Sequence, residues 1–164
     1  MVNLEYVKHV LNLPLSDEEM RNIASPELEV FIHTSFKFLQ LGTFLGSIFG
    51  PLTHMYKSRK SKSKYTTVFH ALKQTSRKSA MLFFLIGSPL SIYILQNSTK
   101  EKNFKRAYGL RMHITQSNVD RGALLGGTTG LLLANLSSAK MIHGGFYGFA
   151  LGTLGGILYN QTLQ

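Results

Sequence analysis

The sequence predicts an all-α integral membrane protein: a four-helix bundle with Gly-rich helix packing and a short soluble N-terminal helical segment. Three observations predict it. Four windows of 18 to 24 residues contain no Asp, Glu, Lys or Arg. Glycines recur every four residues in three of these windows. Charge is segregated, with most acids in the first 29 residues and most basic residues in the connections between the windows.

The uncharged windows cover 38–56, 79–99, 122–139 and 141–164. A helix needs about 20 mostly apolar residues to cross the hydrocarbon core of a bilayer. A surface helix of a soluble protein needs a polar face, so four such windows in 164 residues favour a membrane domain. We therefore expect this domain over 30–164.

The segment 1–29 precedes this domain and holds six of the eight acids, which is typical of an extramembrane helical segment. Ser16 and Glu19 have the spacing of a capping box, with acids in the first helical turn. No basic start and apolar run precede residue 30, so we expect no secretory signal peptide. The acids also argue against a cleavable mitochondrial presequence, which would be acid-poor.

The first span is expected over about 30–56. Ser25 has the character of an N-cap, and Pro26 suits the first helical position. Pro51 is expected to end or kink this helix.

The second span is expected over about 79–97, with Pro89 in its middle. Proline is tolerated inside spanning helices because neighbouring groups satisfy the freed backbone atoms. The preceding stretch, 66–78, has helical apolar spacing and predicts an amphipathic lead-in helix.

The third and fourth spans are expected over about 120–137 and 142–160. Only Lys140 separates the two uncharged windows, which predicts a tight hairpin with a short third span.

The glycine ladders are the most specific feature of the sequence. Residues four apart lie on one face of a helix, where a row of glycines lets another backbone approach closely. In a soluble helix each glycine costs about 0.5–1 kcal/mol relative to alanine, so the rows require a compensating helix contact. The predicted helix-packing residues are Gly42, Gly46, Gly50, Gly122, Gly126, Gly130, Gly144, Gly148, Gly152 and Gly156.

The connection after the first span is strongly basic, since residues 57–78 carry eight Lys and Arg and no acid. The residues expected to face anionic lipid or a partner are Lys57, Arg59, Lys60, Lys62 and Lys64. Basic loops tend to stay on the side of insertion. This predicts the first connection on the electrically negative side of the membrane, which in a mitochondrion is the matrix. Both termini are then expected on the opposite side, which in a mitochondrion is the intermembrane space.

The sequence offers no constellation for catalysis or metal binding. No two of the six His lie three or four residues apart, and no acid lies inside an uncharged window to pair with them. We expect no enzymatic activity, metal or cofactor, and a bound phospholipid such as cardiolipin is the one candidate ligand.

Asp120 and Arg121 form a charged pair where the third span is expected to begin. They fit two interpretations. One is a polar anchor that fixes the third helix against the preceding connection or a partner. The other is an ordinary helix start with Asp120 at the cap.

Four short spans, the glycine ladders, a basic first connection and a charged entry to the third span resemble the mitochondrial preprotein translocase superfamily of the inner membrane. The resemblance covers about residues 30–160. In its best local match Asp120, Gly126-Gly127 and Gly130 fit the superfamily signature in kind, at shorter spacings. The signature has an Arg four residues before the Asp, where this chain has Gln116. Arg111 or Arg121 is a candidate substitute.

The superfamily contains translocases and an accessory subunit of respiratory complex I. This chain lacks the paired Cys of some translocase members and has few polar groups inside its windows. The resemblance therefore favours a non-catalytic accessory or assembly subunit of a respiratory complex, with complex I first. The alternative is a translocase component. Other membrane subunits and anionic lipids are the expected partners, with no nucleic acid and no small-molecule substrate.

A third hypothesis is a basic soluble RNA- or ribosome-binding protein. The net charge of +10 suits it, but it leaves the four uncharged windows unexplained.

Overall fold

A computed structural model describes residues 6–8, 13, 15–59, 67–137 and 141–162 of the chain. Within this part the protein is all-helical and contains no β-strand, which confirms the predicted all-α class. Residues 6–8 are helical, and the helices that follow are α2 (Asp17–Arg21), α3 (Pro26–Ser58), α4 (Val68–Gln96), α5 (Lys100–Met112), α6 (Ile114–Leu136) and α7 (Met141–Thr162).

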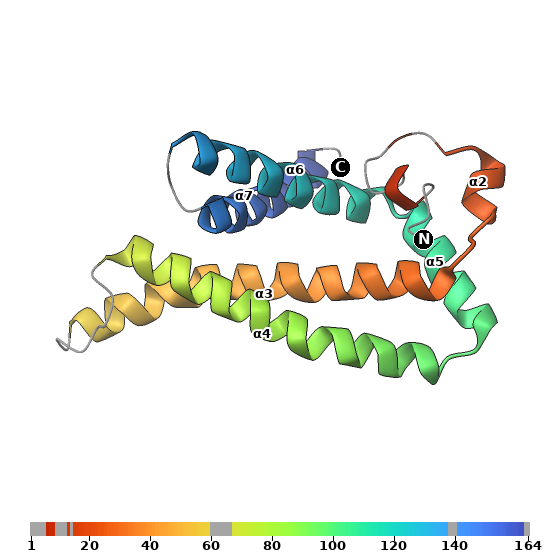
Figure 1. Cartoon of the computed structure of the whole chain (residues 1–164), viewed down its shortest axis with the longest axis horizontal. Coiled ribbons are helices and arrows are strands. Elements are labelled where there is room, and N and C mark those ends of the chain that lie inside the picture. Colours follow the sequence, from red (N-terminus) through yellow and green to blue (C-terminus); the bar gives the residue numbers. More distant parts are fainter. Residues whose placement is uncertain (1–5, 9–12, 14, 60–66, 138–140, 163–164) are drawn as a thin grey trace.

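The four long helices form two antiparallel pairs (Figure 1). Helices α3 and α4 make one pair and α6 and α7 the other, and packing is far more extensive within each pair than between them. The C-terminal ends of α3 and α6 lie toward one end of the molecule, and helices α2 and α5 lie at the other (Figure 1). The short helix α5 connects the two pairs.

Helices α2 and α3 begin where the sequence predicts. Ser16 caps α2 in a complete capping box, in which the Glu19 amide donates to the Ser16 hydroxyl over 3.1 Å. Ser25 is the N-cap residue of α3 and Pro26 its first residue.

Pro51 is expected to end or kink the first helix. It does not end the helix, because α3 continues to Ser58. A proline removes one backbone hydrogen bond. The adjacent Gly50 packs against Ala71 and Thr75 of α4, which holds α3 directly before the proline.

Three further boundaries differ from the expectation. The stretch 66–78 is not a separate lead-in, because α4 begins at Val68 and runs through Pro89 to Gln96. The connection before the third span is helical and forms α5. Helix α6 begins at Ile114, so the third long helix starts about two turns earlier than predicted. Packing of these polar stretches against α3 extends the helices beyond their uncharged windows.

Small side chains lie inside the protein and large apolar side chains lie outside, which is the opposite of a soluble domain. The buried residues are mostly small or polar, including Ala71, Ala80 and Ala123. Large apolar side chains lie outside, and Leu85 and Leu151 are each 68 % exposed. Among the described helices, His70–Gln96 and Met141–Thr162 are long and apolar enough to cross a membrane by length and composition. Only 22 % and 17 % of their most apolar stretches are buried, unlike the core helices of a soluble protein.

Candidate functional site

A buried ion pair joins the start of α3 to the end of α5. The Arg111 guanidinium donates two hydrogen bonds to the Glu29 carboxylate, one of them from Nε to Oε2 over 3.1 Å. Its third nitrogen donates to the backbone carbonyl of Glu19 in α2. Glu29 is 2 % and Arg111 4 % exposed, so neither charge is solvated by water. One side chain therefore links three helices at this end of the molecule.

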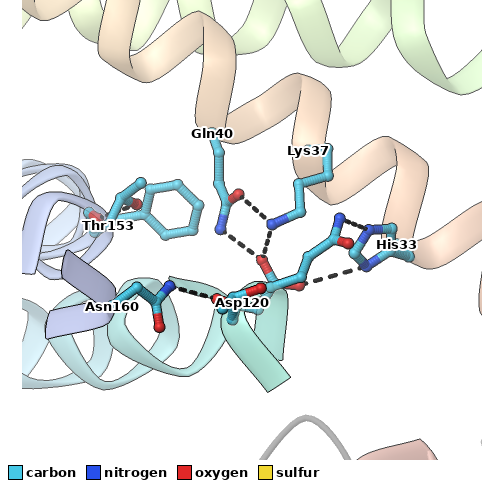
Figure 2. Close-up of polar contacts among 9 residues, drawn as sticks. His33, Lys37, Gln40, Asp120, Thr153 and Asn160 are labelled. Carbon is cyan, nitrogen blue, oxygen red and sulfur yellow. Dashed lines mark hydrogen bonds and ion pairs between the residues drawn. The ribbon is translucent and has the colours of Figure 1, made fainter. Parts of the chain in front are cut away.

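Asp120 is the centre of a second polar group, which joins α6 to α3 (Figure 2). Its Oδ1 accepts from Lys37 Nζ over 2.5 Å and from Gln40 Nε2 over 2.9 Å. Its Oδ2 lies 3.4 Å from His33 Nδ1, and Gln116 Nε2 lies 2.6 Å from the other ring nitrogen. We call His33, Lys37, Gln40, Gln116 and Asp120 the polar cluster.

The structure decides between the two interpretations of Asp120. It lies inside α6, two turns after the start, and is 6 % exposed, so the cap interpretation is wrong. The anchor contacts α3 rather than the connection before the helix. Arg121 is exposed and lies outside the polar cluster, because a helix turns about 100° per residue. Asp120 lies just outside the uncharged window 122–139, and from there it contacts His33.

The partners of Asp120 and Arg111 were missed from the sequence, although a signal was present. Glu29, His33, Lys37 and Gln40 are spaced by four, four and three residues. That spacing places them on one face of a helix. A polar stripe on the first half of an otherwise apolar helix indicates a polar partner on that side.

Tyr6 belongs to the N-terminal segment and lies beside this polar stripe. It is 9 % exposed, and burial raises the pKa of its hydroxyl, with a further rise from the negative charges of Asp120 and Glu29. Lys8 Nζ forms an ion pair of 2.7 Å with Glu19 Oε1 in α2. Tyr6 and Lys8 therefore lie at the same end of the molecule as Arg111.

The glycines of α6 and α7 face each other along the contact between these helices. A Cβ atom built at Gly122, Gly126 or Gly130 would overlap a backbone carbonyl oxygen of α7, and the reverse holds from α7. Gly156 meets Val119 in the same way, with 2.7 Å to its Cα. We call this contact the glycine seam; its residues are Gly122, Gly126, Gly130, Gly144, Gly148, Gly152 and Gly156.

The first ladder packs on α4. A Cβ atom at Gly42 would lie 2.6 Å from the Ser79 carbonyl oxygen, and one at Gly46 would lie 2.6 Å from Ser76 Cα. Beside Gly46 the side chains of α4 are small, and the hydroxyls of Ser47 and Ser76 are 2.8 Å apart across the interface. All ten predicted glycines therefore lie at contacts between helices.

An open groove of about 670 Å³ runs along one side of the glycine seam. Its walls are Leu125, Leu133 and Leu151 together with backbone of the seam. Lys73 of α4, Ser137 and His143 also line it, and these three lie near the link between α6 and α7.

The predicted basic loop is described only in part. Lys57 lies in the last turn of α3 and Arg59 directly follows it, and both are exposed. Lys60, Lys62 and Lys64 lie outside the described residues. No group of three or more His, Asp or Glu side chains that could hold a metal ion lies within the described part of the chain.

Comparison with known proteins places the chain in a family. Residues 6–163 match the family described as "Protein of unknown function (DUF1757)". No curated protein matches the chain. Since the match extends over nearly the whole sequence, including α2 to α7, the chain belongs to the DUF1757 family.

Proposed function

We propose that the chain is a multi-pass membrane protein with a structural, non-catalytic role in a respiratory complex of the mitochondrial inner membrane, complex I being the first candidate. One observation carries this proposal: large apolar side chains face outward while small residues fill the contacts between helices. Lipid tails solvate Leu and Phe, so helices in a bilayer associate through close packing of small residues. In water the same surface would be a large aggregation-prone apolar patch.

Four crossings by α3, α4, α6 and α7 agree with their alternating directions (Figure 1). Helix α7 is the shortest of the four at 22 residues, or about 33 Å at 1.5 Å per residue, which exceeds the hydrocarbon core of about 30 Å. In this topology the links after α3 and α6 share one side. Because Lys57 and Arg59 lie there, that side would be the matrix, with both termini in the intermembrane space.

Buried charges that satisfy one another support a structural role. Glu29 is paired with Arg111, and Asp120 accepts from both Lys37 and Gln40. A translocase needs a hydrophilic surface that can contact a passing polypeptide. These polar groups instead bind one another and hold the helices together. The resemblance to the superfamily with a complex I accessory subunit directs the proposal to a respiratory complex.

A translocase component is the second candidate, and the groove beside the glycine seam favours it, since an open lateral groove could receive an extended segment. This candidate predicts that a photoreactive residue at position 129, in the groove wall, crosslinks to a precursor arrested during import. The structural role predicts crosslinks to resident subunits or lipid instead.

The test is to follow the tagged full-length protein through carbonate extraction of mitochondrial membranes and then through a native gel in mild detergent. Retention in the pellet and co-migration with a large respiratory assembly would support the proposal. Co-migration with import machinery would favour the second candidate. Release into the supernatant would contradict both candidates and would favour the third hypothesis, a basic soluble protein.

A further inference from the structure

The groove beside the glycine seam changes character along its length. Toward the link between α6 and α7 it is lined by Lys73, Ser137 and His143. Away from this link it is lined by apolar side chains, among them Leu125 and Leu151, and by glycine backbone. Its volume of about 670 Å³ lies within the range of about 300–1,000 Å³ usual for ligand sites. A ligand that fits must have a polar head and a long apolar tail.

The polar end of the groove is positive. Arg77 lines a smaller hollow that shares Lys73 and His143 with the groove. None of the ion pairs formed by the described residues uses Lys73 or Arg77. The sequence contains no acid between residues 30 and 100, so no acid on α4, or on α3 beyond its first turn, offsets these charges. Charge complementarity therefore selects an anionic head group.

We infer that this groove is a binding site for one anionic phospholipid, whose phosphate contacts Lys73 and whose acyl chain lies along the glycine seam. The inference rests on the proposed membrane location. The wall from Leu125 to Ser137 is about 18 Å long at 1.5 Å per residue, and one leaflet contributes about 15 Å of the hydrocarbon core. The site therefore has the depth of a single leaflet, with its positive end at the leaflet surface.

The lipid also explains why the groove can remain open. A close backbone contact between α6 and α7 leaves a furrow, because glycine has no side chain to fill the space beside the seam. An acyl chain fills such a furrow without a partner subunit. The bound lipid would thus complete the packing of the α6–α7 pair against the start of α4.

The experiment measures lipid binding to the purified full-length protein by native mass spectrometry after exchange into detergent with phosphatidylglycerol or phosphatidylcholine. The variants are Lys73→Met, which removes the charge at the groove, and Thr129→Phe, which fills it. The matched controls are Lys78→Met, an exposed lysine of the same helix, and Thr128→Phe, whose side chain lines an apolar pocket on the other face of α6.

We expect one phosphatidylglycerol per chain, bound in preference to phosphatidylcholine. Lys73→Met should weaken phosphatidylglycerol binding about five-fold, the effect of one basic residue near an anionic lipid surface. Thr129→Phe should abolish binding of both lipids, and the two controls should bind like the unmodified protein.

Equal binding of the two lipids, or unchanged binding in both Lys73→Met and Thr129→Phe, would overturn the inference. Crosslinking of an arrested import precursor, and not of lipid, to a photoreactive residue at position 129 would also overturn the inference, in favour of a polypeptide site. Carbonate extraction of the same protein distinguishes failure of the lipid site from failure of the proposed membrane location. Retention in the membrane without lipid selectivity contradicts only the lipid site, whereas release contradicts the membrane location itself.

Discussion

Helix α6 is held on two sides by different means. On the side of α7 the glycine seam brings backbone against backbone, and Asn160 near the end of α7 adds hydrogen bonds to Asn118 and Thr115. On the side of α3 the polar cluster joins the helices through Asp120, Lys37 and Gln40, with less contact overall. Dispersion between close-packed backbones depends on shape along the whole contact. A charged hydrogen bond depends on a few atoms at one place.

These two kinds of contact have different places in the molecule. Each antiparallel pair is built from extended close packing. The two pairs are joined by fewer contacts, among them the hydrogen bonds of Asp120 and the edge-to-face contact of Phe36 with Phe149. Substitutions in the seam should act by separating helices, and substitutions of the polar groups should act by leaving a buried charge without its partner.

The largest effect is expected where the buried charge is most enclosed. Arg111→Met would leave Glu29 unpaired and should lower the free energy of unfolding by about 3–5 kcal/mol, the usual result of removing one partner of a buried pair. The measurement is the midpoint of denaturant unfolding in detergent, followed by circular dichroism. Arg106→Met, on the exposed side of the same helix, should change the midpoint little. Equal effects of the two variants would show that the pair of Glu29 and Arg111 does not contribute more to stability than an exposed arginine.

The glycine seam is tested by the smallest possible side chain. Gly148→Ala should destabilise the protein by about 1–3 kcal/mol, because the new methyl group meets the Gly126 carbonyl oxygen and forces α6 and α7 apart. Gly155→Ala is the matched control, since no atom lies within 4 Å of a Cβ there. It should be neutral or stabilising by up to about 1 kcal/mol. If thermal unfolding of the two variants is the same, the seam is not a packing contact.

Asp120 belongs to the polar cluster and Arg121 does not, so substitutions of these two residues should differ in effect. Asp120→Asn keeps the shape but removes the charge that Lys37 faces, and should cost about 1–2 kcal/mol. Arg121→Gln should have no measurable effect because Arg121 is exposed. A double-mutant cycle of Asp120→Asn with Lys37→Met measures the coupling; a coupling energy near zero would contradict the contact.

The smallest effect is expected at the exposed edge of this end, where Lys8 pairs with Glu19. The hydrogen bond from Lys8 holds the pKa of the Glu19 carboxyl below its usual value. A lowered folded-state pKa gives a contribution that is present above the unfolded pKa and lost as pH falls through the folded one. Limited proteolysis of the N-terminal segment should therefore accelerate as pH falls below the range in which an ordinary glutamate carboxyl titrates. In Lys8→Met the same acceleration should already be present at neutral pH.

Much of the helical content could be predicted from local pattern. Ser16 with Glu19, and Ser25 with Pro26, mark helix starts because capping depends on neighbours three residues away. Helix ends were less predictable. Pro51 does not end α3 and the polar stretch before Asp120 is helical, because packing on other helices outweighs the local preference.

The sequence by itself determined that the glycines of each ladder share a helix face, since periodicity is a property of a single helix. It also determined that Asp120 stands out as a charged residue beside an uncharged window. Only the tertiary structure decided that the last two ladders face each other while the first faces α4, and that Asp120 reaches Lys37. Lys37 and Asp120 are 83 positions apart. Contacts at that separation depend on how whole helices pack, which no local spacing specifies.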